Sequence, residues 1–253
     1  MEDKLVTIIA NSKARLVPKK LSILSLSKDE EAILLNKMNT YIKYIINLTL
    51  ALLLFSCATE KPVNLSIARE EVKQYYESGR FDKELSKVIE DAKEKFDKVE
   101  FKNNSVVIFD VDETALDNYG LAKEMDFGYV YEMNKKWNAE MKAPAIPQVK
   151  ELYDFLLAKG AKIIFLTGRN FPEYKVTYEN LKRDGYTTFD TLITQMDNER
   201  DLSATEFKSK KREELTKRGY EIIGTVGDQW SDLNGPYHGI QVKIPNYLYL
   251  IKD

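Results

Sequence analysis

Residues 106–118 read VVIFDVDETALDN and place four acidic side chains directly behind an apolar run. A continuous apolar run between polar flanks predicts a strand buried on both faces, here over residues 105–110. A core strand does not ordinarily end in clustered carboxylates, so these acids are candidates for chemistry. Asp110 and Asp112 stand two residues apart and would share one face of an extended backbone.

Three further apolar runs and a short C-terminal run repeat the strand pattern. They cover residues 161–166, 191–193, 220–226 and 240–244. Helical periodicity lies between the strands, at residues 147–158, 172–183 and 206–218. Gly160, Gly185 and Gly219 stand where helices commonly end on glycine. Strands alternating with helices of these lengths predict an α/β fold, a Rossmann-like parallel sheet with helices on both faces.

Two helical segments lie outside this alternation. Residues 66–99 have apolar side chains at three- and four-residue steps, and Gly79 divides them into two predicted N-terminal helices. Residues 116–145 are longer than a simple connection and hold several aromatic side chains. They are therefore a candidate small helical cap over the strand ends.

Polar residues follow three of the predicted strands. They are Asp110, Asp112, Thr167, Gly168, Arg169, Asp228 and Asp232. Because ligands of parallel sheets bind beyond the carboxyl ends of the strands, these groups should converge on one site. Asp110 and Asp112 would repel each other unless a cation separated them, and Mg²⁺ takes such oxygen ligands. Asp228 can supply a third oxygen, and Asp232 can steady the water shell of the metal.

The same edge of the sheet offers groups that bind an anion. The candidate phosphate ligands are Thr114, Thr167, the amides of Gly168 and Arg169, and a lysine. With phosphate beside Mg²⁺, one aspartate can attack phosphorus and form an aspartyl-phosphate. The other can protonate the leaving alcohol and then activate water. Metal and lysine would offset the charge on the transferring group.

The composition excludes several other kinds of site. The chain has one cysteine, Cys57, and one histidine, His238, so neither an internal disulfide nor a zinc site of cysteine and histidine can form. A Ser–His–Asp triad would need His238, which has no matching context. The net charge of −2 gives no support for a nucleic-acid polymer as partner. A calcium-binding structural loop and a receiver-like acidic site are the alternatives for Asp110 and Asp112.

Four motifs, FDVDET, LTGR, FKSKKR and GDQWSD, occur in the order of the four motifs of the haloacid dehalogenase-like superfamily. The segments DETALDN, KAPAIPQVKELY, GDQWSDL and KIPNYLYLI resemble its acid phosphatase branch. That branch contains the bacterial class C lipoprotein acid phosphatases and the plant acid phosphatases related to vegetative storage proteins. The resemblance runs from residue 66 to the C-terminus and implies the haloacid dehalogenase-like fold.

The resemblance also implies roles for individual residues. Asp110 would be the nucleophile and Asp112 the general acid and base, while Thr167 would bind phosphate. Mg²⁺ would be held by Asp110, the carbonyl of Asp112 and Asp228, with Asp232 in support.

Other roles stay open within the resemblance. Lys208 matches the third-motif lysine best, with Lys210 and Lys211 as alternatives. Arg169 would contact substrate, or else cap a helix or form a salt bridge. The lipoprotein members often cleave nucleoside monophosphates and stack the base on aromatic side chains. The aromatic candidates are Tyr119, Tyr131 and Trp137. Alternatively, these rings form the core of the cap.

Residues 38–56 resemble the signal peptide of a bacterial lipoprotein. Lys43 gives a positive start, and residues 44–55 form an apolar stretch shorter than a membrane span. The segment closes on LFSC, which resembles a lipobox. In that family the signal is cut before the cysteine, here Cys57, whose thiol carries lipid. The alternative is a buried helix that happens to end in a cysteine.

A signal peptide starts at the N-terminus, so Met38 is the expected start and residues 1–37 an expected misread extension. A cytoplasmic tail before an uncleaved anchor is the alternative. Residues 57–65 would then tether a phosphatase domain, residues 66–253, to the membrane. The sequence thus predicts a Mg²⁺-dependent phosphomonoesterase, an acid phosphatase lipid-anchored in a bacterial cell envelope. A surface or storage lipoprotein that keeps the fold, and a phosphotransferase, are the alternatives.

Overall fold

The computed structural model describes residues 28–54 and 62–252 of the chain. The chain divides into two units, Met1–Pro62 and Val63–Asp253. Cys57, the predicted lipid attachment site, lies outside the described residues, so its predicted role stays a prediction.

The first unit contains helix α2 (Lys28–Leu54), which includes Met38 and most of the apolar stretch of the predicted leader. Side chains whose burial is described, such as Ile42 and Tyr44, are exposed on this helix. Within the described residues, no helix combines the length and the apolar composition needed to cross a bilayer.

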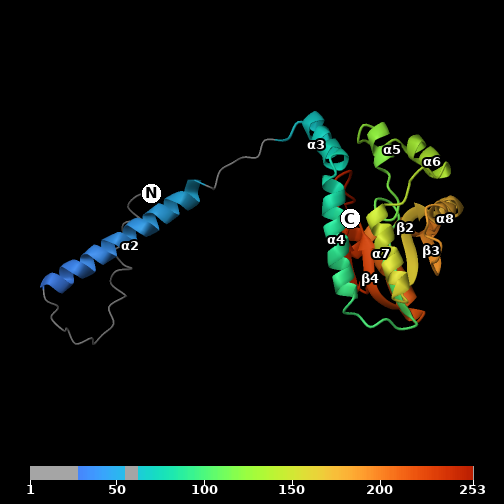
Figure 1. Ribbon diagram of the computed structural model, residues 1–253. Helices are drawn as coiled ribbons and strands as arrows, with labels where there is room; N and C mark the ends of the chain where they lie inside the picture. Colours follow the sequence, from blue (N-terminus) through green and yellow to red (C-terminus); the bar gives the residue numbers. More distant parts are fainter. Residues whose placement is uncertain (1–27, 55–61, 253) are drawn as a thin grey trace. The chain divides into compact units, whose positions relative to one another are not determined.

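The described part of the second unit holds one five-stranded parallel sheet in the order β3-β2-β1-β4-β5, as Figure 1 shows in part. Its strands are β1 (Ser105–Phe109), β2 (Lys162–Asn170), β3 (Thr191–Gln195), β4 (Glu221–Gly227) and β5 (Ile240–Lys243). The sequence neighbours β1 and β2 pair directly, but β4 lies on the other side of β1. The direction of winding therefore reverses between β1 and β4, which is where open parallel sheets bind ligands.

Helices surround this sheet, and two short ones form the segment predicted to be a cap. The N-terminal and cap helices are α3 (Leu65–Glu77), α4 (Arg80–Phe96), α5 (Tyr119–Glu124) and α6 (Tyr131–Ala139). The others are α7 (Pro147–Ala158), η1 (Phe171–Glu173), α8 (Tyr174–Arg183), η2 (Asp197–Glu199), α9 (Ala204–Lys217) and α10 (Trp230–Leu233). The predicted α/β fold with helices on both faces is confirmed.

The central strand β1 is buried on both faces, which explains its unbroken apolar run. On one face, Val107 and Phe109 pack in a core with side chains of α4 and α7. On the other face, Val106 and Ile108 pack against Phe207 of α9. Burying each such side chain stabilises the fold by about 1.5–3 kcal/mol, so the end of β1 is rigidly placed.

Some strands and helices begin or end at other residues than predicted. They do so where hydrogen bonds extend the element beyond its run of apolar residues. Strand β2 continues four residues past its predicted end, because Asn170 pairs with Gln195 of β3 after a shift in register. Helix α9 begins two residues early, because Ser203 and Glu206 cap each other's backbone N–H groups. The predicted helix at 172–183 starts as the 3₁₀ turn η1.

The glycines predicted to end helices do so in the left-handed backbone region. Gly160, Gly185 and Gly219 follow α7, α8 and α9 with φ of 87°, 95° and 92°. Gly79, with φ of 77°, separates α3 from α4. These predictions are confirmed.

Candidate active site

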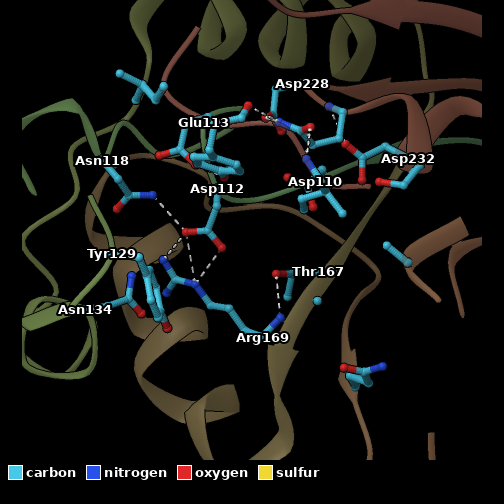
Figure 2. A pocket seen from close by; sticks show the side chains of 18 of the residues that line it. Asp110, Asp112, Glu113, Asn118, Tyr129, Asn134, Thr167, Arg169, Asp228 and Asp232 are labelled. Atoms are coloured by element: carbon cyan, nitrogen blue, oxygen red, sulfur yellow. Dashed lines mark hydrogen bonds and ion pairs between the residues drawn. The ribbon is translucent and has the colours of Figure 1, made fainter. Parts of the chain in front are cut away.

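The polar groups predicted to converge do lie together, around a cavity of about 800 Å³ at the carboxyl ends of the strands. Asp110 directly follows β1, and Asp228 directly follows β4, on the two sides of the point where the strand order reverses. The cavity is also lined by Asp112, Thr167, Gly168, Arg169, Lys208 and Asp232, several of which Figure 2 labels. Tertiary structure thus joins side chains from four separate motifs.

Three of the described carboxylates form a compact acidic group. Asp110, Asp228 and Asp232 each offer an oxygen, and these oxygens lie within 4.8 Å of one another. Burial raises the pKa of Asp110 well above its usual range, with Lys208 opposing and the neighbouring aspartates reinforcing that rise. Burial and the charge of Asp232 raise the pKa of Asp228 to about 6. The surroundings therefore offset only part of the negative charge that the fully ionised group would carry.

A buried lysine, Lys208, supplies part of the positive charge that these carboxylates need. The Nζ atom of Lys208 lies 2.5 Å from Asp110 Oδ1 and 3.1 Å from Asp232 Oδ1. Burial opposes its positive charge, but the two aspartates outweigh burial and raise the pKa of Lys208. Since one ammonium faces three carboxylates here, a divalent cation with oxygen ligands fits the donor set.

The structure separates Lys208 from the two lysines that sequence alone left as alternatives. Lys211 Nζ lies 2.6 Å from Glu199, away from the aspartates. Lys210 is half exposed and lies 4.0 Å from the same glutamate. Of these three lysines, only Lys208 lines the cavity, because Glu199 binds the side chain of Lys211 and lies beside that of Lys210.

Asp228 is held by three described side chains from separate parts of the chain. Thr114 Oγ1 donates to Oδ1 at 3.1 Å, while Gln229 Nε2 and Asn246 Nδ2 each donate to Oδ2 at 2.6 Å. Thr114 was expected to bind phosphate, but it is fully buried and does not line the cavity. The reason is a turn: Glu113 has φ of 53°, so the backbone is no longer extended beyond Asp112.

The two aspartates of the first motif serve different partners. Asp110 faces Lys208, whereas the Asp112 carboxylate pairs with Arg169, as Figure 2 shows. Burial would raise the pKa of Asp112, but Arg169 and the amide of Asn118 outweigh it and lower that pKa. Of the three roles left open for Arg169, the structure shows the salt bridge. Thr167 and Gly168 line the cavity, and the Thr167 hydroxyl accepts from the Arg169 amide at 3.1 Å.

Asp232 is positioned by a close backbone approach and by an arginine that the sequence analysis did not select. A Cβ on Gly227 would lie 2.4 Å from the Cβ of Asp232, so only glycine admits this approach. Arg212 is fully buried and donates to the carbonyls of Asp232, Asn234 and Pro236. The basic segment at residues 208–212 of α9 therefore has one buried face, which holds Lys208 and Arg212. Lys208 and Arg212 are four residues apart and therefore share one face of the helix. This spacing was the available signal that Arg212 is buried beside the site.

The aromatic side chains selected as substrate contacts lie elsewhere in the cap. Tyr119 stacks on Tyr76 at 4.8 Å and donates to Glu77, and Tyr131 is mostly exposed. Trp137 packs against the core and donates to Asn118 at 3.0 Å. None of these three described residues lines the cavity, which corrects the expected substrate contacts. Helices α5 and α6 are short, so the sequence pattern does not determine which way each aromatic ring points. The packing of the cap on the rest of the domain determines it.

Other apolar side chains form one wall of the cavity. The cap contributes Leu121, Met125, Phe127 and Tyr129, and the C-terminal segment contributes Leu248, Tyr249 and Ile251. The Tyr249 hydroxyl donates to Glu113, and the Ile251 amide donates to Gln229 at 3.0 Å. The C-terminal segment was expected only as part of the family resemblance. Its run of apolar residues, 247–251, was the available signal that this segment packs on the rest of the domain.

Comparison with known proteins identifies the family. Residues 54–252 match the family model of the HAD superfamily, subfamily IIIB (acid phosphatase). The chain belongs to this family, as its motifs indicated. It is 34% identical over 186 residues to acid phosphatase 1 of Solanum lycopersicum, covering 71% of this chain and 73% of that protein.

Other relatives carry different names. The chain is 38% identical over 159 residues to a stem 31 kDa glycoprotein of Glycine max, covering 60% of this chain and 62% of that protein. It is 35% identical over 156 residues to vegetative storage protein 1 of Arabidopsis thaliana, covering 58% and 56%. It thus spans about three fifths of the length of these relatives.

A solved structure has the same fold. The class C acid phosphatase from Bacillus anthracis, with tungstate bound, superimposes with a TM-score of 0.60 at 20% identity. The match covers 72% of this chain and 85% of that one.

Proposed function

We propose that this protein is a Mg²⁺-dependent acid phosphatase that hydrolyses phosphate monoesters through an aspartyl-phosphate. The observation that carries the proposal is the buried group of three carboxylates and Lys208 in one cavity, in a chain of an acid phosphatase family. Asp110, Asp228 and Asp232 would hold the metal, which when bound supplies positive charge for the transferring phosphoryl group.

The residues of the first motif would divide the reaction between them. The Asp110 carboxylate attacks phosphorus, and the bond from phosphorus to the ester oxygen breaks while Asp112 protonates the leaving alcohol. Water then attacks the phosphorus of the aspartyl-phosphate and gives its proton to Asp112. The bond to Asp110 breaks, and inorganic phosphate leaves. Lys208 holds Asp110 in place and offsets charge in both steps.

The substrate we propose is the phosphate ester of an alcohol with a flat or apolar body. The wall formed by Phe127, Tyr129 and Tyr249 favours such a group over a small polar one. Nucleoside monophosphates meet this description, and a screen that compares them with sugar phosphates tests it.

Metal removal tests the proposed reaction. Residues 58–253 should hydrolyse p-nitrophenyl phosphate, and EDTA should lower the rate about 100-fold or more, because several kcal/mol of charge stabilisation are lost. Added Mg²⁺ should restore the rate. A chain that folds but shows no metal-dependent turnover above an Asp110→Asn background would refute the proposal. It would favour a storage role, which the names of two relatives, vegetative storage proteins 1 and 2 of Arabidopsis thaliana, suggest.

We also propose that Cys57 carries lipid and anchors the phosphatase in a bacterial cell envelope. The positive Lys43, the apolar stretch and the LFSC sequence support this. The intact mass of the protein from native membranes should fit a chain that begins at Cys57 with acyl groups attached. An unmodified chain that begins upstream of Met38 would contradict the anchor.

A further inference from the structure

We propose that Arg169 is a positioning residue that holds the Asp112 carboxylate in place for activation of water in the second step. The inference rests on the proposed function and assigns Arg169 no contact with substrate. It starts from the two-point salt bridge between these residues. Arg169 Nε lies 3.0 Å from Asp112 Oδ2, and its NH2 atom lies 2.6 Å from Oδ1. Two parallel contacts of this kind fix the plane of a carboxylate as well as its distance.

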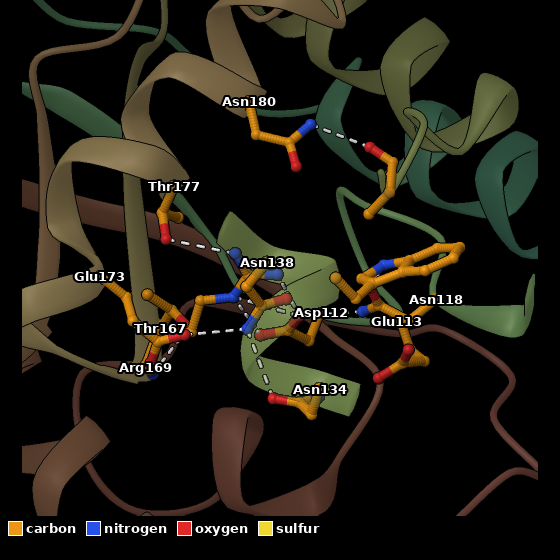
Figure 3. A network of polar contacts seen from close by, with 12 residues as sticks. Asp112, Glu113, Asn118, Asn134, Asn138, Thr167, Arg169, Glu173, Thr177 and Asn180 are labelled. Carbon is orange, nitrogen blue, oxygen red and sulfur yellow. Dashed lines mark hydrogen bonds and ion pairs between the residues drawn. The ribbon is translucent and has the colours of Figure 1, made fainter. Parts of the chain in front are cut away.

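Arg169 is itself held, so it can act as a fixed support. Its side chain is only 4% exposed. The NH1 atom donates to Thr177 Oγ1 of helix α8 at 3.2 Å, and Figure 3 shows Arg169 between Thr177 and Asp112. Each nitrogen of the guanidinium therefore has a partner within the protein. These contacts use three of the five N–H donors of the guanidinium and hold its plane between helix α8 and Asp112.

The opposite side of the carboxylate is fixed by the cap. Asn118 Nδ2 donates to Asp112 Oδ1 at 2.9 Å, and Trp137 of α6 donates to the side-chain oxygen of Asn118 at 3.0 Å. Oδ1 thus receives donors from two sides. Among the described residues, Oδ2 receives only Arg169 Nε. Because a carboxylate oxygen has two lone-pair sites, Oδ2 is the atom left to take a proton from water.

The step that Arg169 supports can be written in full. Water oxygen forms a bond to the phosphorus of the aspartyl-phosphate, and its proton passes to Asp112 Oδ2. The bond from phosphorus to the Asp110 oxygen breaks, and its electron pair returns to the carboxylate. A freely rotating Asp112 would meet the water in the required geometry only part of the time, so this step would slow.

Kinetics with p-nitrophenyl phosphate isolate this step, because p-nitrophenolate leaves with little need for a proton. Arg169→Met should lower kcat about 100-fold, the scale of one general base, while kcat/KM changes less than about threefold. Acid-quenched protein should then carry a phosphoryl group in the intact mass. Arg169→Lys, which keeps the charge without the two-point contact, should recover only part of kcat.

If Arg169→Met does not fold, Thr177→Val tests the same inference. It removes only the hydrogen bond that Arg169 NH1 donates to Thr177 Oγ1. It should lower kcat a few-fold in the same pattern. An equal fall in kcat and kcat/KM without phosphoryl accumulation would mean a merely structural role and overturn the inference. A fall in kcat/KM with weaker inhibition by inorganic phosphate would mean contact with substrate and overturn it too. Absence of turnover in the unaltered protein would instead overturn the proposed function, and the inference with it.

Discussion

Asp110→Asn is expected to lower the rate of phosphate ester hydrolysis by on the order of 10⁴-fold or more, because the amide cannot attack phosphorus. The loss should be in kcat, since Lys208, Thr167 and Gly168 still line the cavity and can still bind phosphate. The folded state should not suffer. Burial and three neighbouring aspartates already disfavour the ionised form of Asp110, so a neutral side chain of the same shape relieves repulsion. Thermal unfolding should show an equal or higher melting temperature.

Asp117→Asn is the matched control, because it makes the same change in the same stretch of sequence. The Asp117 carboxylate accepts from the amide of Tyr119 at 2.7 Å and does not line the cavity. An asparagine keeps that acceptor, so activity should stay within a few-fold of the unaltered protein. If Asp110→Asn kept more than a few per cent of the rate, another group would have to be the nucleophile.

Arg212→Met should destabilise the folded protein by about 3 kcal/mol or more. The substitution removes three hydrogen bonds donated by a charged group, which are worth about 1.5–3 kcal/mol each. It also leaves the buried carbonyl of Asp232 without its donor. A domain of this size loses about 2–4 °C in melting temperature per kcal/mol, so a fall of roughly 6–12 °C is expected. Because Asp232 is one of the three clustered carboxylates, Mg²⁺ affinity should fall as well.

Lys210→Met provides the comparison on the same helix. The Lys210 side chain is 52% exposed, so its replacement should change stability by less than about 0.5 kcal/mol. Calorimetric unfolding of both variants gives the contrast. A melting temperature of Arg212→Met within 2 °C of the unaltered protein would contradict the support assigned to Arg212.

The fold was largely predictable because its signals are local. A strand buried on both faces needs an unbroken apolar run, and β1 and β2 have one. Gly160, Gly185 and Gly219 end helices because a left-handed backbone costs glycine little. The ends of β2 and α9 were less predictable. They depend on pairing between Asn170 and Gln195 and on capping by Ser203, which the apolar periodicity does not report.

The site was predictable at the strand ends and less so beyond them. Asp110 and Asp228 follow neighbouring strands, so the parallel sheet had to bring them together. Thr114 was misplaced because the backbone turns at Glu113, and no pattern in the sequence announces a left-handed glutamate. The aromatic residues of the cap were misjudged because so short a segment has no helical face defined by sequence alone.

By itself, the sequence determined the order of the elements, the parallel sheet and the set of acids at its carboxyl edge. Those properties follow from periodicity and from the alternation of strands and helices. Only the tertiary structure decided which cation each acid faces. Lys208 meets Asp110, Arg169 meets Asp112, and Arg212 holds the loop of Asp232. Such pairings join residues from 20 to 98 positions apart, and they depend on how helix α9 and strand β2 pack against the first motif.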